Sequence, residues 1–354
     1  MPVVLLLDEQ PQLGMGDEQA PARRTLQDGD AASYLLGHLA TVLGACSRRH
    51  AATLMRRTST CAAPSRNNSL RTAPTPRPAR RPSGGHTFRV TTRSRAADYP
   101  YFDNGGRPIA FAHRGGALTG DTELLENTMA AFQAAVDLGY RFVETDVHAT
   151  QDGVLVAFHD PTLERTTDAE GLISDLTYRE LLSVKIGGRE AIPRLSDLLS
   201  TWPHVRFNID AKSPRAVRLL AAAIDEHRAW DRVCVASFSA PQLRQLRRLL
   251  GPRVATAHSA VGITALRLLP TRTLRRFTVG RHGQAAQVPL RRGPLEIVTP
   301  SFLDAAHVLG KQVHVWTINA PNEMHRLLDL GVDGIVTDHI EVLRDVYRSR
   351  GIWD

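Results

Sequence analysis

Residues 141–160 read RFVETDVHATQDGVLVAFHD. Two short apolar runs, 141–147 and 154–159, lie on either side of the QDG sequence, which is typical of a turn because Gly153 can adopt a positive φ. Each run finishes on polar side chains. A buried strand that points polar groups out of its end costs a few kcal/mol for each group that stays unsatisfied. The pattern therefore predicts two strands whose ends form part of a site.

The polar residues of this stretch are two carboxylates and an imidazole. Glu144 and Asp146 are two residues apart, so a strand places both side chains on one face, where their mutual repulsion favours a bound cation. If the segment is a tight hairpin, His159 lies opposite residues 145 and 146. A short parallel return would bring it to the same end of the strands, beside the carboxylate pair.

The same pattern of apolar runs continues outward along the chain. Between most of the runs lie segments with helical periodicity, such as one at 127–138 for which Asn127 is the expected N-cap. The other expected helices span 195–201, 214–228, 240–250, 301–309 and 321–330. The remaining runs are PIAFAH (108–113), VRFNIDAK (205–212), RVCVASF (232–238), VATAH (254–258), LEIVT (295–299), VHVWTIN (313–319) and GIVTD (334–338).

Alternation of strands and helices over about 250 residues predicts a single α/β domain with the architecture of a (β/α)8 TIM barrel. Nine runs are available for eight places, so we expect one of the last four to lie outside the wall. The long connection between Asp160 and Val205 is expected to pass over the barrel mouth. We therefore predict a barrel domain over 101–354, preceded by an extension over 1–100.

Polar residues close nearly every strand of this predicted barrel. They are His113 and Arg114, Glu144 and Asp146, His159 and Asp160, Asp210 and Lys212, Trp316 and Asn319, and Asp338. The carboxyl ends of the strands meet on one face of a (β/α)8 barrel, where active sites lie, so these residues should form one cluster.

The chemistry of the cluster suits a phosphorylated substrate. Three carboxylates (Glu144, Asp146 and Asp210) without a cysteine favour a hard ion, Mg²⁺ or Ca²⁺, over zinc. Arg114 can bind phosphate oxygens in a bidentate fork. Lys212 is one of only three lysines among 44 basic residues. Its presence in a chain that otherwise uses arginine indicates that this position favours the compact positive charge of an ammonium group. Two histidines can supply one general base and one general acid near neutral pH.

In its ordered motifs the chain resembles the glycerophosphodiester phosphodiesterase family. The matching segments are AHRGG (112–116), ENT (126–128), ETDVHATQDGVLVAFHD (144–160), TLERTTDAEG (162–171), IPRLSDLL (192–199), NIDAK (208–212), VWTIN (315–319) and GVDGIVTD (331–338). The resemblance covers residues 108 to 342. It implies a barrel that hydrolyses glycerophosphodiesters to an alcohol and sn-glycerol 3-phosphate with a divalent metal.

The resemblance also implies roles for individual residues. His113 and His159 would form the catalytic acid and base pair, and Arg114 and Lys212 would contact the phosphate. The metal would be held by Glu144, Asp146 and Asp210; the family usually has Glu at position 210, one methylene longer. Trp316 falls where the family lines its glycerol pocket, or is plain core. Glu126 orients Arg114, or belongs only to a helix cap.

Several neighbouring residues have two interpretations from sequence alone. Asp160 either orients His159 or only starts a turn, and Asp338 is expected to make a structural hydrogen bond to the first strand. Five further histidines are expected to be structural or surface residues: His148, His258, His307, His314 and His339. The sequence leaves open the alcohol leaving group, the choice of metal, the oligomeric state and whether water or a glycerol hydroxyl attacks first.

The N-terminal extension carries most of the excess charge. Residues 1–100 hold 14 Lys+Arg and 7 Asp+Glu, which accounts for +7 of the formal net charge of +8. The Arg/Pro-rich segment 48–95 has no acidic residue and is expected to be disordered, and 31–45 could form a short helix. The basic pI therefore says nothing about the partner of the barrel, and a nucleic-acid partner is not expected.

The cysteine content and the apolar segments also indicate the cellular compartment of the protein. Cys46, Cys61 and Cys234 form neither a disulfide framework nor a metal knuckle, which indicates reduced thiols. No secretory signal and no apolar segment long enough to span a membrane is found, so the cytoplasm is the expected compartment.

Two alternative functions remain at this point. A lysophospholipase D or a phosphoinositide-type phosphodiesterase could use the same barrel, but it needs an apolar rim for acyl chains, and the aromatic-poor sequence shows no clear one. A non-catalytic phosphodiester-binding barrel would lack one of the histidines or carboxylates, and all of them are present.

Overall fold

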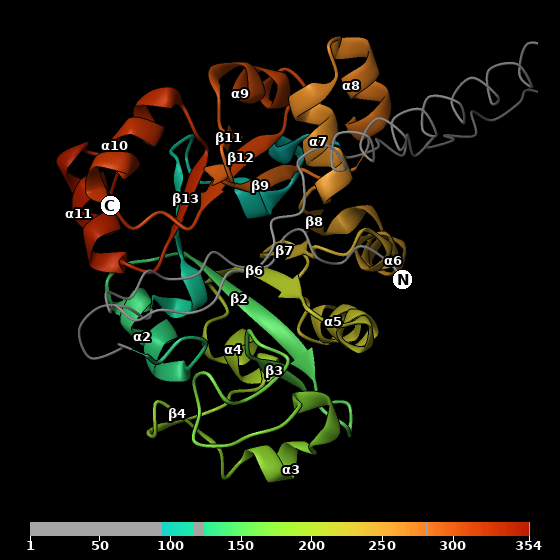
Figure 1. Cartoon of the computed structure of the whole chain (residues 1–354), viewed down its shortest axis with the longest axis vertical. Helices are drawn as coiled ribbons and strands as arrows, with labels where there is room; N and C mark the ends of the chain where they lie inside the picture. The colour runs from blue at the N-terminus through green and yellow to red at the C-terminus, as the bar shows by residue number, and fades with distance from the viewer. Residues whose placement is uncertain (1–93, 117–123, 281, 354) are drawn as a thin grey trace, which may run out of the picture. The chain divides into compact units, whose positions relative to one another are not determined.

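Eight parallel strands form the wall of a barrel in the computed structural model, which describes residues 94–116, 124–280 and 282–353 (Figure 1). These residues belong to one compact unit, Arg89–Asp354. In hydrogen-bonded order the strands are β8 (Ala255–Thr256), β7 (Val233–Ala236), β6 (Arg206–Ala211), β2 (Phe142–Ala149), β1 (Ile109–Ala112), β13 (Gly334–Thr337), β12 (Gln312–Trp316) and β9 (Ala285–Pro289).

The barrel closes between its first and last strands in this order. The backbone N–H of His258 donates to Ala285 O at 2.8 Å, and that of Gln284 donates to Thr256 O at 2.7 Å. Each wall strand is covered on both faces, which is why the strands read as continuous apolar runs rather than as alternating ones. The predicted (β/α)8 architecture is confirmed.

Helices cover the outside of the wall (Figure 1). They are α2 (Met129–Asp137), α4 (Leu195–Thr201), α5 (Pro214–Glu226), α6 (Ala240–Leu250), α7 (Ala260–Leu268), α8 (Arg272–Val279), α9 (Pro300–His307), α10 (Pro321–Leu330) and α11 (Ile340–Ser349). In α5, Ser213 caps the first turn by accepting from Ala216 N, and Pro214 supplies the fixed φ of the first position. Its Leu220 and Ile224 are fully buried, and burial of each side chain contributes about 2 kcal/mol to the stability of the fold.

Aromatic side chains close the barrel at the amino-terminal ends of the strands. Two 3₁₀ helices, Ala96–Asp98 and Pro100–Phe102, bring Tyr101 and Phe102 against Phe111 and Phe142. Packing therefore begins before residue 101, where the barrel domain was expected to start. The division at residue 100, the disordered extension and the helix at 31–45 remain predictions, because their residues lie largely outside those that the structure describes.

The strand pattern differs from expectation at two places. The run at 295–299 lies outside the wall, as expected for one of the last four: Leu295–Glu296 (β11) pairs with Arg291–Arg292 (β10) in a hairpin. The run at 154–159 is also outside the wall, because Leu155–Ala157 (β3) pairs antiparallel with β2 only. The missing wall strand is β9, whose Ala-Ala-Gln-Val-Pro sequence has too few β-branched residues to be recognised.

The helix predictions also needed correction. The segment 260–279 forms α7 and α8, and 340–349 forms α11; none of these was expected. The N-cap of α2 is Thr128, whose hydroxyl accepts from Ala131 N, so the assignment of Asn127 as the cap is wrong. Asn127 has instead a φ of 59° and points its side chain toward the strands.

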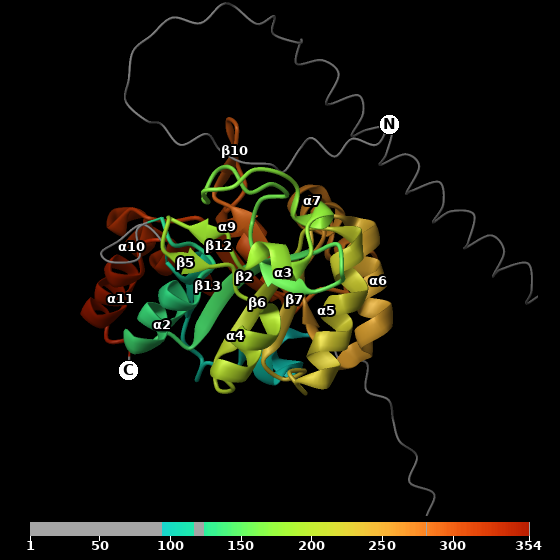
Figure 2. The ribbon, with the colours of Figure 1, turned by 90° about the horizontal axis from the view of Figure 1, so that it is seen from below.

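The connection between Asp160 and Val205 forms a subdomain on the mouth side of the barrel, on the same side as the β10–β11 hairpin (Figure 2). It contains α3 (Tyr178–Leu181) and the hairpin β4 (Lys185–Ile186) and β5 (Glu190–Ala191). Its own apolar cluster includes Leu163, Ile173 and Leu181, all buried. This packing gives the subdomain a fixed position from which Arg165 can reach the site.

Candidate active site

The carboxyl ends of the barrel strands bring the predicted site residues together. The register of β2 and β6 places Asp146 directly beside Asp210, with Glu144 one pleat below on the same face. His113 follows β1, and Asp338 follows the neighbouring β13. The expected cluster at the mouth is therefore present.

Lys212 compensates two of the three carboxylates. Its Nζ lies 3.1 Å from Asp146 Oδ1 and 3.1 Å from Asp210 Oδ2. Arg114 adds a second positive charge, with Nε 3.3 Å from Asp146 Oδ2. Three buried carboxylates against two cations leave one excess negative charge in this group.

The excess negative charge affects the pKa values of the three carboxylates. Burial and the nearby Asp146 raise the pKa of Glu144 to about 8. Burial likewise raises the pKa of Asp210. For Asp146, burial acts in the same direction, but Lys212, Arg114 and the histidines outweigh it and lower the pKa. The site would hold all three carboxylates ionised at neutral pH only with more positive charge than its own side chains supply.

The donor set fits a hard divalent cation. Asp210 Oδ1 is buried and has no hydrogen-bond partner, so one carboxylate oxygen is already uncommitted. Within the described residues no group of three or more His, Cys, Asp or Glu side chains is arranged to hold a metal ion. Lys212 Nζ bridges Asp146 and Asp210, the two carboxylates that would contribute to such a group. Carboxylate oxygens without thiolates suit Mg²⁺ or Ca²⁺.

His113 is held by a carboxylate on the neighbouring strand end. Its Nδ1 donates to Asp338 Oδ1 at 2.5 Å, and its Nε2 lies 3.8 Å from Glu144 Oε2. Asn319 donates to Asp338 Oδ2 at 2.9 Å and so fixes that carboxylate. Burial and Arg114 lower the pKa of His113, but Asp338 and Glu144 outweigh them, and the net pKa is raised.

His159 arrives by the hairpin route. The register places Ala157 opposite Val147, and Phe158 N donates to Asp146 O at 3.1 Å, so His159 follows at the mouth. Its Nδ1 donates to Asp160 Oδ1 at 2.5 Å, which favours the orienting role of Asp160 over the role of a turn former. His148, expected to be structural, bonds the His159 carbonyl at 3.0 Å.

Glu126 connects the phosphate-binding candidate to the second histidine. It accepts from Arg114 Nη1 at 3.2 Å, in keeping with an orienting role. Arg165 forms a bidentate pair with Glu126 at 2.9 and 2.6 Å and also binds Asp160 Oδ2 at 2.5 Å. Arg165 was not singled out from sequence, although it lies in the TLERTT motif.

Backbone conformation around Arg114 is unusual. Arg114 and Asn127 have φ of 53° and 59°, and Asn127 N donates to Arg114 O at 2.7 Å. The Asn127 side chain donates to Asp146 Oδ2 at 3.3 Å and accepts from Thr145 at 2.7 Å. Such strained residues persist only where their surroundings hold them, and here those surroundings fix Asp146. Spacing alone gave no signal for this role.

An aromatic wall borders the charged group. The rings of Trp316 and Phe238 are T-shaped with centroids 6.0 Å apart, and Lys212 Nζ lies 5.4 Å from the Phe238 centroid. Trp316 is half-buried and Phe238 is 44% exposed. Trp316 packs partly against the buried core and partly against Phe238, and Phe238 is a further residue that sequence reasoning missed.

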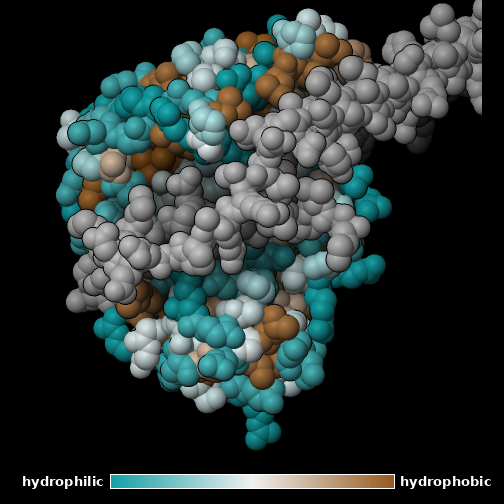
Figure 3. Space-filling view, in the orientation of Figure 1, coloured by the Kyte–Doolittle hydropathy of each residue, from teal (hydrophilic) through white to brown (hydrophobic). Residues whose placement is uncertain are grey.

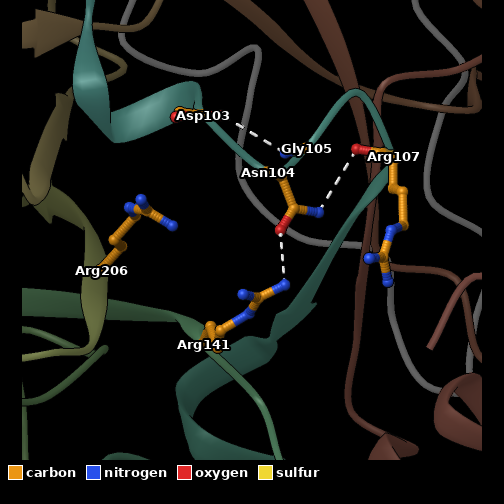
Figure 4. A pocket seen from close by; sticks show the side chains of 6 residues that line it. All are labelled: Asp103, Asn104, Gly105, Arg107, Arg141 and Arg206. Carbon is orange, nitrogen blue, oxygen red and sulfur yellow. Dashed lines mark hydrogen bonds between the residues drawn. The ribbon is translucent and has the colours of Figure 1, made fainter. Parts of the chain in front are cut away.

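A different polar cavity lies at the amino-terminal ends of the strands (Figure 4). It has a volume of about 280 Å³ and is lined by Asp103, Asn104, Gly105, Arg107, Arg141 and Arg206. Asn104 donates to the carbonyls of Arg107 and Pro108 and accepts from Arg141. These bonds shape the turn that leads into β1, and no histidine lines the cavity.

Comparison with known proteins places these residues in a family context. Residues 113–342 match the glycerophosphoryl diester phosphodiesterase family. A probable glycerophosphodiester phosphodiesterase 2 of Mycobacterium tuberculosis is 39% identical over 257 residues, which cover 72% of this chain and 96% of the relative.

Solved structures show the same fold. A glycerophosphoryl diester phosphodiesterase described as putative, from Silicibacter pomeroyi, has a TM-score of 0.61 at 24% identity and covers 72% of this chain and 100% of its own. A phosphodiesterase of Oleispira antarctica, determined with the product sn-glycerol-3-phosphate, has a TM-score of 0.57 at 23% identity, with 68% and 97% covered.

Proposed function

The chain belongs to the glycerophosphoryl diester phosphodiesterase family and is a phosphoric diester hydrolase, and we propose that it uses a histidine pair and a divalent cation to release sn-glycerol 3-phosphate from small glycerophosphodiesters. The observation that carries the proposal is the pair of imidazoles, each held at Nδ1 by a carboxylate, at the mouth that also holds Arg114, Lys212 and three carboxylates. The Oleispira relative, which binds sn-glycerol-3-phosphate, supports the choice of product.

The chain's own residues supply positioning and proton transfer. Arg114 and Lys212 bind the non-bridging phosphate oxygens, and Trp316 packs against the glycerol carbons. Because Asp338 and Asp160 accept the Nδ1 protons, each imidazole presents Nε2 to the substrate. One imidazole removes a proton from the attacking oxygen, which belongs to water or to a glycerol hydroxyl, as the new P–O bond forms, and the other donates a proton to the alcohol oxygen as its P–O bond breaks. If a glycerol hydroxyl attacks, water then opens the cyclic phosphate, with the two imidazoles in exchanged roles, to give sn-glycerol 3-phosphate.

Glu144, Asp146 and Asp210 would hold the cation, which stabilises charge on the phosphoryl group when it is bound. The shorter Asp210 is compatible with this role because one of its oxygens is uncommitted. Calorimetric titration of Mg²⁺ and Ca²⁺ tests this assignment without reference to turnover. We expect Asp210→Asn to weaken binding at least tenfold and Asp210→Glu to retain it. Equal affinity of wild type and Asp210→Asn would remove Asp210 from the ligand set.

The reaction is tested by release of glycerol 3-phosphate from glycerophosphocholine and glycerophosphoethanolamine, with and without EDTA. His159→Gln should lose at least a hundredfold in rate. His307→Gln is the matched control, because His307 pairs with Asp333 at 2.7 Å away from the mouth. Full activity of His159→Gln would exclude the histidine pair.

A lysophospholipase D activity remains the second candidate, and three exposed apolar side chains that follow wall strands support it. Exposed Phe238, Val261 and Leu295 follow β7, β8 and β9 at the mouth. Choline release from lysophosphatidylcholine distinguishes the two activities. A higher kcat/KM for lysophosphatidylcholine than for glycerophosphocholine would reassign the preferred substrate.

The location of the protein and its small-molecule partner remain proposals from sequence. None of the described helices is both long and apolar enough to cross a membrane. We retain the cytoplasm as the proposed compartment and a small phosphodiester as the proposed partner.

A further inference from the structure

The barrel domain is close to neutral overall, but its basic and acidic residues are unevenly distributed along the chain. Residues 233–295 contain 11 arginines and no Asp, Glu or Lys, whereas the rest of 101–354 carries 19 basic and 29 acidic residues. This stretch forms β7, α6, β8, α7, α8, β9 and most of the β10–β11 hairpin. One side of the barrel is therefore strongly basic while the remainder is acidic.

Large apolar side chains are exposed on the same side. Val261 and Leu268 on α7 are 64% and 53% exposed, and Phe277 on α8 is 76% exposed. Apolar atoms gather over α7 and α8 in the space-filling view (Figure 3). On α8, Phe277 directly follows Arg276, and Arg272 lies one turn before Arg276; both arginines are also exposed. We call α7, α8 and the β10–β11 hairpin the basic apolar face.

Two parts of this face adjoin the mouth of the active site, whereas α8 leads back to the amino-terminal end of β9. The segment of α7 begins just after the carboxyl end of β8, and the hairpin follows the carboxyl end of β9. Leu295 of the hairpin is exposed beside Arg291 and Arg292. Phe238, at the end of β7, packs edge-on against Trp316 with ring centroids 6.0 Å apart.

We propose that the basic apolar face docks on an anionic phospholipid surface. Arginines near such a surface are attracted to its negative potential, and exposed aromatic and aliphatic side chains insert at the boundary between headgroups and acyl chains. A nucleic acid would match the arginines and could stack on Phe277, but it gives Val261 and Leu268 no apolar partner. The aliphatic residues therefore favour a lipid surface. This proposal does not depend on which phosphodiester the active site cleaves.

Vesicle flotation with the full chain tests the docking. The vesicles contain phosphatidylglycerol and phosphatidylcholine at about 3:7, with pure phosphatidylcholine as reference. The double variant Arg272→Gln, Arg276→Gln should bind the anionic vesicles about 25-fold more weakly, roughly fivefold per arginine. Phe277→Ser should bind about tenfold more weakly.

A matched double variant controls for net charge. Arg218→Gln with Arg348→Gln removes two exposed arginines from α5 and α11, outside the face, and should change binding less than about twofold. The N-terminal residues are common to all variants, so their contribution cancels in the comparison. Thermal unfolding midpoints equal to wild type show that each variant is folded, and activity on glycerophosphocholine is measured separately.

Two results would overturn the docking proposal. In the first, the Arg272/Arg276 and Phe277 variants bind anionic vesicles as tightly as the control variant. In the second, the arginine variant keeps its vesicle binding but loses retention of duplex DNA, which would assign the face to nucleic acid. Failure of the wild type to hydrolyse glycerophosphocholine would affect the proposed function alone.

Discussion

Replacement of Asp338 by Asn tests whether the hydrogen bond from His113 Nδ1 to Asp338 holds the imidazole in the catalytic tautomer. Asp338 accepts from His113 Nδ1 at 2.5 Å with one oxygen and from Asn319 Nδ2 at 2.9 Å with the other. An Asn side chain cannot accept both donors, because one of its two terminal groups is itself a donor. If the amide faces His113, Nδ1 becomes an acceptor and the proton moves to Nε2, so the imidazole is held in the wrong tautomer.

The expected effect on activity follows from the bond that is lost. A hydrogen bond to a charged partner contributes about 1.5–3 kcal/mol, which corresponds to roughly 10- to 100-fold in kcat/KM. A fully inverted tautomer would cost more, about 10⁴-fold when the aspartate of a serine protease triad is replaced in the same way. Without Asp338, burial and Arg114 dominate the pKa of His113, so the limb of the pH–rate profile that reports His113 should move to lower pH.

The same variant has a pH-dependent effect on stability. The pKa of His113 is raised on folding, so its contribution is present below the unfolded value of about 6.5 and is lost as the pH rises through the folded value. The pKa of Asp338 is lowered, so its contribution is present above about 4 and is lost on further acidification. The loss of unfolding free energy should therefore be largest between about pH 4 and 6.5, and smaller at pH 8.5.

Denaturant unfolding at pH 5.5 and 8.5, together with a pH–rate profile, measures both effects. His307→Gln removes a partly exposed His–Asp pair and should cost less than about 1 kcal/mol without altering kcat. An Asp338→Asn protein with wild-type kcat/KM and an unshifted profile would refute the role of Asp338 in holding the His113 tautomer.

Three further variants test the supports of the site. Gly115→Ala should destabilise by about 3 kcal/mol in denaturant unfolding, because Gly115 has a φ of 88° and a Cβ there would lie 2.8 Å from the Ala131 Cβ. Arg165→Gln should lower kcat about tenfold with little change in KM, and Arg165→Lys should restore part of it; Arg194→Gln, which breaks an exposed pair with Asp197, is the control. Asn127→Ala should lower both stability and kcat/KM, by about 1–2 kcal/mol each, and an unchanged kcat/KM would contradict the positioning of Asp146 by Asn127.

The residues at the strand ends are the part of the site that could be predicted from the sequence. Carboxylates two residues apart share a strand face, and the barrel rule brings all strand ends to one mouth, so the grouping of His113, Glu144, Asp146 and Asp210 was predictable. His159 was expected at the mouth by either of two routes, a tight hairpin or a short parallel return, and the structure shows the hairpin. These inferences depend on local periodicity, which tertiary packing preserves.

Other features depend on contacts between distant segments. The pair of Arg165 with Glu126 joins residues 39 positions apart, and that of His113 with Asp338 joins residues 225 apart. The positive φ of Asn127 reverses its expected role from cap to carboxylate support. No spacing rule encodes these contacts, because they arise only when the barrel closes.

Sequence alone therefore determined the barrel architecture, the residue types at its mouth and the family resemblance, because each follows from short-range pattern. Tertiary structure alone decided that Lys212 lies between two aspartates and that Arg165 joins Glu126 to Asp160. It also decided that arginines and large apolar side chains of the acid-free segment are exposed together on one side of the barrel. The physical reason is that ion pairing, burial and surface exposure are set by the distances between segments, and those distances exist only in the folded chain.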